Sequence, residues 1–316
     1  MCIGFGLKPV GVCLALALSA ALPMQASGQT VVVTATSSEG WIPQFSGTAS
    51  GEFVPGPELP PVGSGSFEFR VGADGDSAAQ LRNVEFDGVP LSEITTLTYN
   101  TYVQEDGSGG QAPYLILHID QDDDGDVDDL LFFEPVYQTG DYSGDPVPDQ
   151  GDLVVGEWQT WDALEGGWWS LNDMNFGPPL VTLATYLEEN PDAVIRNTES
   201  GEGGLRIVTG FGAPAWDGFV GNVDSLTIAI GNEEVTYDFE ATLVIDDCDT
   251  GVVDLVIDEE GTRLSDRIAE LAATARNHGQ FVKGVAQLTN QLKKDGLISG
   301  AEKGAIQSCA AESSLP

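Results

Sequence analysis

The sequence predicts a mainly β protein, with a jelly-roll or β-sandwich domain followed by a small α-helical module at the C-terminus. Most of the chain consists of short segments in which apolar and polar residues alternate between turn residues, as expected for the strands of a sandwich. After Asp249 the apolar residues instead recur at the spacing of amphipathic helices. The N-terminal residues have a third character, that of a targeting segment.

Residues 1–28 match a secretory signal peptide. Lys8 precedes an apolar run over 10–24, and small residues follow at 26–28. The run is shorter than the roughly 20 apolar residues of a membrane-spanning helix, and polar sequence follows it. Cys13 lies within the run, whereas a lipoprotein anchor would need its cysteine after the run. We therefore expect a secreted protein, extracellular or, if retained, periplasmic; an uncleaved anchor is the alternative.

The segment 29–245 is predicted to form an acidic β-sandwich domain. Its opening stretch, up to residue 65, is rich in Gly and Pro after a first short strand, which indicates irregular surface chain. A helix is expected at 180–189, where apolar residues share one helical face before Asn190 and Pro191. Strands are expected at 31–33, 66–71, 94–103, 114–119, 130–133, 205–208, 225–230 and 235–239.

The segment 246–316 is predicted to be a linker and a module of three helices. The first helix has Ser265 or Thr262 as its N-cap, the second covers 281–292, and the third covers 299–309. A module of this size has a small core and is marginally stable unless a cross-link supports it.

Cys248 and Cys309 are the cysteines that remain after removal of the signal peptide. An even number of cysteines in an exported chain predicts a disulfide, which would tie the last helix to the chain leaving the β domain. Two free buried thiols are the alternative.

The charge of the chain is strongly negative and unevenly distributed. The chain has 50 acidic and 12 basic residues and a net charge of −38. The segment 29–245 holds 38 of the acids and only four arginines, which gives it a net charge of −34. Such a domain repels nucleic acids and anionic membranes, so we expect no nucleic-acid partner. We also expect no membrane span, because no apolar stretch after the signal peptide approaches ~18 residues. The charge indicates either adaptation to a salty medium or dependence on divalent cations.

The most specific local pattern is the segment 120–129, which carries seven carboxylates. Its oxygen donors at the first, third, fifth and ninth positions, with Gly at the sixth, follow the first part of an EF-hand loop. The twelfth position is Leu131 in place of the usual Glu, so Asp129 or Glu134 would supply the missing donor. An acidic hairpin turn without an ion is the alternative. We expect one calcium ion, bound by Asp120, Asp122, Asp124, Asp126 (through its carbonyl) and Asp128.

Tryptophans form a second pattern. Aromatic rings on a rigid β scaffold stack on sugar rings, so Trp158, Trp161 and Trp168 are candidate glycan-binding residues. If their segment is a strand, Trp168 and Trp169 point to opposite faces, and at most one of the two joins a binding surface. The alternative is that most of these rings fill the core.

Catalytic patterns are sparse. The two histidines, His118 and His278, have no recognisable nucleophile partner, and His118 falls in a strand pattern that favours packing. Neither a Gly-x-Ser-x-Gly motif nor a zinc-ligand spacing is present. The sequence leaves open a pair of catalytic carboxylates of the kind that glycosidases use. With so many acidic residues, the presence of such a pair would not indicate an enzyme. We therefore name no catalytic residue and favour a protein that is not an enzyme.

Several short motifs resemble known secreted bacterial proteins. FVGNVDSLTI at 219–228 and YDFE at 237–240 are similar to the closing strands of jelly-roll carbohydrate-binding modules. The acidic segment resembles the DxDxDG calcium loops of extracellular proteins. NHGQFV at 277–282 and GAIQSCA at 304–310 resemble a C-terminal segment of uncharacterised secreted bacterial proteins. The resemblance to carbohydrate-binding modules implies a sandwich fold and a polysaccharide or cell-surface glycan as partner.

Three functions remain in order of preference. The first is a secreted, non-catalytic module that binds glycan and is stabilised by calcium. The second is a structural or adhesive extracellular protein bridged by divalent ions. The third is a polysaccharide hydrolase.

Overall fold

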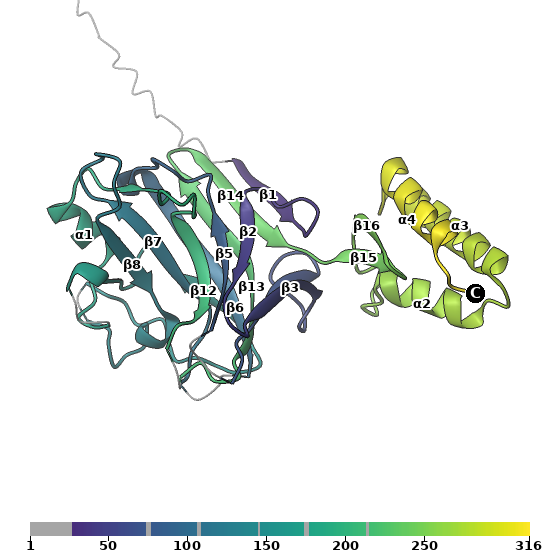
Figure 1. Cartoon of the computed structure of the whole chain (residues 1–316), viewed down its shortest axis with the longest axis horizontal. Helices are drawn as coiled ribbons and strands as arrows, with labels where there is room; N and C mark the ends of the chain where they lie inside the picture. Colours follow the sequence, from purple (N-terminus) through teal and green to yellow (C-terminus); the bar gives the residue numbers. More distant parts are fainter. Residues whose placement is uncertain (1–26, 74–76, 106–108, 145, 174–176, 213–214) are drawn as a thin grey trace, which may run out of the picture.

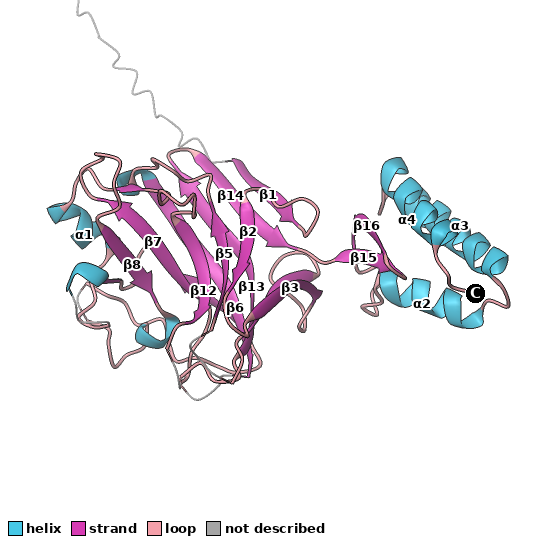
Figure 2. Ribbon diagram, in the orientation of Figure 1, coloured by secondary structure: helices cyan, strands magenta, loops and turns pink. Residues whose placement is uncertain are grey.

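The computed structural model describes residues 27–73, 77–105, 109–144, 146–173, 177–212 and 215–316. A β-sandwich is followed by a helical module that lies to one side of it, as Figures 1 and 2 show. The predicted fold class is therefore confirmed. The expected signal peptide lies outside the described residues except for Ser27 and Gly28, which pair with Glu233 and Glu234 in the first sheet.

Two sheets of seven strands each form the described part of the sandwich. The first sheet contains β1 (Ser27–Val33), β3 (Ser50–Pro55), β4 (Gly65–Arg70), β6 (Ile94–Glu105), β9 (Trp158–Asp162), β13 (Val220–Ile230) and β14 (Glu233–Phe239). The second sheet contains β2 (Trp41–Phe45), β5 (Ala78–Asn83), β7 (Tyr114–Asp120), β8 (Asp129–Phe133), β10 (Trp169–Ser170), β11 (Val194–Ile195) and β12 (Leu205–Gly210). The order in the second sheet is β10-β8-β7-β12-β5-β2, with β11 beside β7.

Strand β13 is the centre of the first sheet, because it pairs with three neighbours. Strand β6 runs antiparallel to it along one edge. Its other edge is shared: the first half pairs with β4 and the second half with β14. The register shifts between Asp224 and Thr227, where Ser225 adopts a left-handed φ of 53°. This bulge marks the point at which β4 and β14 separate.

The structure corrects the expectation of irregular chain before residue 65. Strands β2 and β3 lie there, each at the outer edge of its sheet. Pro43 lies within β2 and Pro55 ends β3, and proline is tolerated in an edge strand because one side of the strand needs no ladder hydrogen bond. Proline content alone was therefore a misleading signal.

Short helical segments connect the strands. Helix α1 (Leu183–Glu189) confirms the predicted helix, and the hydroxyl of its N-cap Thr182 accepts a hydrogen bond from the Thr185 amide at 3.2 Å. Three 3-10 turns are described, at Leu91–Glu93, Pro135–Tyr137 and Leu171–Asp173.

The main core fills the space between the sheets. Its largest fully buried side chains include three tryptophans, and the inward-facing residues of both sheets surround them. Trp41 makes edge-to-face contacts with Tyr237 and Phe239 of β14, both at 5.4 Å between ring centroids. Aromatic packing thus fixes edge strand β2 against the first sheet.

The C-terminal module has a second core of its own. It consists of a hairpin, β15 (Thr242–Ile245) and β16 (Cys248–Val253), and the helices α2 (Leu264–Thr274), α3 (His278–Asp295) and α4 (Gly300–Glu312). Hairpin residues Leu243 and Ile245 pack with helix residues such as Phe281 and Ile306. The module therefore begins at the hairpin, a few residues before the expected boundary at 245.

The three predicted helices are all present. Gly296 ends α3 with a left-handed φ of 79°, as glycine commonly does at a helix C-terminus. Helix α2 differs in its cap: Arg263 occupies the N-cap position, and the Asp266 carboxylate accepts the Arg263 amide at 3.0 Å. The expected caps Ser265 and Thr262 were wrong by one or two residues.

A disulfide joins Cys248 of β16 to Cys309 of α4, with the two Cα atoms 5.5 Å apart. It closes a loop of 61 residues around the module. By the chain-entropy argument a loop of this length adds about 4 kcal/mol of stability.

Within the described part of the chain, no helix has the length and apolar character needed to cross a bilayer.

Three acidic side chains are buried near the junction of β13, β14 and β4. Asp224, Asp238 and Glu240 are each at most 5% exposed, beneath the loop before β4. The amides of Val62 and Ser64 in this loop donate to Asp224 and Glu240, whereas Oδ1 of Asp238 has no partner. Burial raises the pKa of Asp224 to about 8, of Glu240 to about 7 and of Asp238 to about 6. The folded state therefore holds protons that the unfolded chain releases.

This burial predicts a pH dependence of stability. Because the folded pKa values exceed those of the unfolded chain, these groups contribute a loss of stability as the pH rises from about 4 to about 8. Asp238→Asn removes one ionisation, so its free energy of unfolding should fall less between pH 5 and pH 8 than that of the wild type. Denaturant unfolding measures this, with the exposed Asp152→Asn as the charge-matched control. Equal pH profiles in both variants would contradict the assignment.

Candidate functional site

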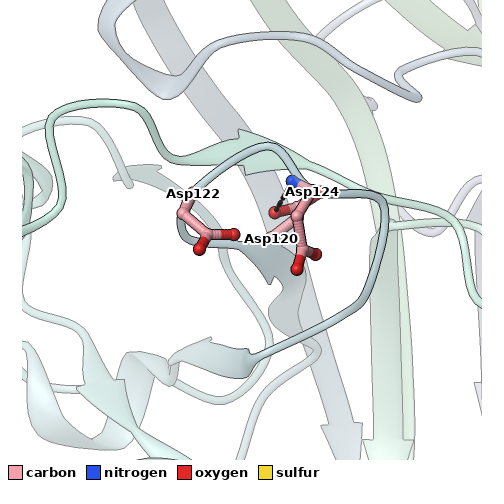
Figure 3. Close-up of side chains that lie close together, drawn as sticks. All are labelled: Asp120, Asp122 and Asp124. Carbon is pink, nitrogen blue, oxygen red and sulfur yellow. Dashed lines mark hydrogen bonds between the residues drawn. The ribbon is translucent and has the colours of Figure 1, made fainter.

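The acidic loop connects β7 to β8 at one end of the second sheet. Its chain turns sharply, with a left-handed φ of 55° at Asp123 and of 106° at Gly125. One carboxylate oxygen from each of Asp120, Asp122 and Asp124 lies within 4.8 Å of the others, and Figure 3 shows these side chains converging. The turn therefore brings together three of the five predicted calcium ligands.

Asp120 is the buried anchor of this group. Its carboxylate accepts the amides of Asp124 at 3.1 Å and Gly125 at 2.9 Å. Arg196, which follows β11, donates to the same carboxylate from Nε at 3.0 Å and from Nη2 at 2.9 Å. Burial acts to raise the pKa of Asp120, but these hydrogen bonds outweigh it and hold the pKa below its usual value. The Arg196 guanidinium thus already neutralises part of the negative charge of the loop.

The remaining carboxylates of the loop repel one another. Asp122 is exposed. Its pKa is raised, first by the negative charge of Asp124, then by desolvation and by the charge of Asp128. Asp126 and Asp128 lie outside the group of three; Asp128 instead accepts the Gln121 amide at 2.9 Å.

Neither expected additional donor faces the loop. Asp129 is buried on the far side, where it accepts Ser170 Oγ at 2.6 Å and the Tyr186 hydroxyl at 3.1 Å. Glu134 follows the opposite end of β8 and accepts Trp169 Nε1 at 2.8 Å. The prediction that one of them completes the calcium site was therefore wrong, because each is held by neighbours from other segments.

The structure also corrects two of the three tryptophan candidates. Trp161 and Trp168 are fully buried in the main core, where their indole N–H groups donate to Thr101 Oγ1 and to the Ala163 carbonyl. Neither ring is accessible to a glycan. Trp158 is partly exposed on the outer face of the first sheet, beside Tyr102, and it stays a prediction.

The outer face of the second sheet carries an aromatic groove that the sequence did not indicate. This outer-face groove has a volume of about 370 Å³, within the usual range for small-ligand sites. It crosses β10, β8, β7 and β12 and ends at the loop that follows β12. Residues that characterise it are Tyr114, His118, Phe132, Glu134, Trp169 and Trp216.

Four aromatic rings form a row along this groove. Phe132 and Trp169 are stacked in parallel, 4.0 Å apart, with an angle of 5° between their planes. Tyr114 lies 6.5 Å from Phe132 and 5.7 Å from Trp216. Phe211, at the rim, is 59% exposed. Tyr114, Trp169 and Trp216 are themselves buried, at 5%, 7% and 3% exposed, so the aromatic surface open to a ligand comes from Phe132 and Phe211. Exposed rings on a rigid sheet are of the kind that contacts sugar rings.

Polar groups interrupt the aromatic surface. Glu134 holds the Trp169 indole through a hydrogen bond, and burial raises the pKa of its carboxyl. His118 is 6% exposed, and its Nδ1 has no hydrogen-bond partner. Burial and then the charge of Arg206 lower the pKa of His118 to about 4. The imidazole is therefore uncharged near neutral pH.

Arg206 is already fully engaged at the edge of the groove. Its Nη2 pairs with Glu202 at 2.8 Å, Nη1 donates to Gln80, and Nε donates to the Gly203 carbonyl. The second histidine, His278, is far along the chain and contacts the carbonyls of Leu315 and Ala311 in the helical module.

Two sequence signals point to this groove in retrospect. The outward residues of β7 are mostly as apolar as its inward residues, although one face of an antiparallel sheet is commonly solvated. The adjacent pair Trp168 and Trp169 does point to opposite faces, as predicted, and it is Trp169 that joins the groove.

No protein-family model matches the chain, and no curated protein matches it. Two solved structures are similar to it. One is SGBP-B from a complex xyloglucan utilization locus in Bacteroides uniformis, 13% identical, with 60% of this chain and 47% of that chain covered and a TM-score of 0.27. The other is the C-terminal family 22 carbohydrate binding module of Clostridium thermocellum Xyn10B, 13% identical, with 62% and 89% covered and a TM-score of 0.23. The chain thus spans about half of the first of them, and similarities this weak carry no argument about the site.

The burial of the three tryptophans predicts how much each one contributes to the stability of the fold. Trp161→Ala and Trp168→Ala should each lower the free energy of unfolding by about 3–5 kcal/mol, because each leaves a large cavity in the core. Trp158→Ala should cost only about 1 kcal/mol, since it removes a partly exposed ring and one hydrogen bond, from Nε1 to the Pro57 carbonyl. Urea unfolding of the three variants measures the difference, and equal losses would show that Trp158 is also core.

Proposed function

We propose that this protein is a secreted, non-catalytic module that binds glycan in the outer-face groove. The observation that carries the proposal is the row of aromatic rings with interspersed polar groups on a rigid sheet. Sugars present apolar C–H faces and hydroxyl groups together, and a surface of aromatic rings, a carboxylate and an imidazole matches both. The disulfide is compatible with export, because such bonds persist in oxidising compartments.

The groove favours binding over hydrolysis. Glycoside hydrolysis requires two carboxyl groups on either side of the scissile bond. Among the described residues that line the groove, Glu134 is the one carboxylate. The two similar structures bear names that refer to xyloglucan utilization and to carbohydrate binding, which agrees with the proposal without supporting it further. A structural or adhesive role bridged by divalent ions is the second candidate, and the acidic loop is what favours it.

The groove can be tested at its exposed ring, Phe211, and at its partly exposed ring, Phe132, with the melting temperature of each variant measured as a check on the fold. Phe211→Ala and Phe132→Ala should each weaken glycan binding about tenfold or more, because each removes ring surface from the sugar contact. Isothermal titration with a panel of soluble polysaccharides measures binding, and Phe45→Ala is the matched control: Phe45 is 43% exposed on β2, outside the groove.

Loss of binding in Trp158→Ala, with both groove variants unaffected, would place the site on the first sheet instead. Absence of binding to every polysaccharide would leave the glycan proposal without support.

We further propose that the acidic loop binds Ca²⁺. Three converging carboxylates are hard oxygen donors of the type that calcium prefers, and the exposed oxygens of Asp122 and Asp124 face the centre of the loop. Arg196 occupies part of the Asp120 carboxylate, so the site would draw further oxygens from backbone carbonyls and water. The mutual repulsion at Asp122 is the cost that a bound cation would relieve.

Calcium should therefore stabilise the fold. At about 100 times its Kd it should add ~2.7 kcal/mol to the free energy of unfolding, and magnesium should add less because it sheds water reluctantly. Thermal unfolding with calcium, magnesium or chelator measures this, on the wild type and on Asp122→Asn/Asp124→Asn. Ionic strength must be held constant, because screening alone stabilises so acidic a domain. An equal response to both cations that persists in the double variant would rule out a specific site.

A further inference from the structure

The arginines of the β domain leave no positive charge for an acidic ligand. Of the four in 29–245, Arg70 pairs with Glu68, Arg196 with Asp120, and Arg206 with Glu202. The fourth, Arg82, lies on β5 outside the groove and donates to the Gly201 carbonyl. An anionic ligand in the groove would thus have to break the ion pair of Arg206 to gain a basic partner, which seldom repays its cost.

The groove itself presents a negative charge. Glu134 lies beside the stacked Phe132 and Trp169, and its described hydrogen-bond partner is the Trp169 indole rather than a base. Arg206 is neutralised by Glu202, and His118 is uncharged near neutral pH. A carboxylate or sulfate on a ligand would therefore face Glu134 across a partly desolvated site, where like charges repel most strongly.

We propose that the outer-face groove takes an uncharged glycan and rejects acidic ones, with Glu134 as the residue that sets this specificity. The inference rests on the proposed glycan-binding function and names the substrate class of the same site. Glu134 accepts hydroxyl groups of the sugar through charge-assisted hydrogen bonds and repels acidic substituents.

The test compares polymers that share one backbone. Xyloglucan, barley β-glucan, arabinoxylan and galactomannan are first titrated into the full-length mature protein at pH 7 and low ionic strength. Each polymer that binds is then compared as its carboxymethyl and its hydroxyethyl derivative, which add similar bulk with and without charge. The carboxymethyl form should bind at least about tenfold more weakly. Polygalacturonate and alginate should not bind.

Glu134→Gln separates the local charge from the charge of the whole domain. The side-chain amide introduced by this substitution would still offer an oxygen to the Trp169 indole, so the melting temperature should not change. The preference for the hydroxyethyl form should shrink several-fold, whereas the exposed Asp152→Asn, which also removes one charge, should leave it intact.

Equal binding of both derivatives, or tight binding of polygalacturonate or alginate, would overturn the inference while leaving glycan binding standing. A preference that survives in Glu134→Gln but vanishes in high salt would overturn the role of Glu134. Failure of every polymer to bind would instead count against the proposed function itself.

Discussion

The first sheet depends on how the chain satisfies its hydrogen bonds where β13 changes neighbours. One edge of β13 passes from β4 to β14 at the bulge around Asp224, and such a junction leaves amides without strand partners. The Asp224 carboxylate accepts two of them, from Phe239 of β14 at 3.1 Å and from Val62 before β4 at 3.2 Å. A buried carboxyl thus holds the two branches of the sheet together. Asp224 is buried without a basic partner, and this unfavourable burial raises the pKa of its carboxyl group.

The second sheet carries the outer-face groove, and its register is set independently of that junction. Inward residues of β7, β8 and β12 pack into the main core, and this fixes which side chains face outward. Three of the four rings of the aromatic row lie on strands fixed in this way, whereas Trp216 comes from the loop that follows β12. The acidic loop lies at the end of the same β7–β8 pair, so a cation there would stabilise strands that also carry the groove.

Local patterns in the sequence predicted local structure well. The short apolar runs on either side of the acidic segment located β7 and β8, and helical spacing with Gly296 located α3. Edge strands β2 and β3 were missed because the stretch up to residue 65 is rich in Gly and Pro, although an edge strand tolerates proline. Trp168 was preferred over Trp169 because a period of two separates two faces without saying which is buried. The groove was not predictable, since it joins strands distant in sequence whose adjacency is fixed only by the sheet order.

The main core of the sandwich and the core of the helical module share no residue, and this separation affects how the chain responds to stress. The main sandwich core ends at Phe239, whereas the module core begins at Leu243, although Val244 of the hairpin lines a pocket together with Trp41 and Phe53 of the sandwich. Because bodies with separate cores can unfold as separate cooperative units, we expect one to open while the other stays native. The disulfide encloses only the helical unit, so a reducing environment would loosen the helices while the sandwich and its groove stayed intact.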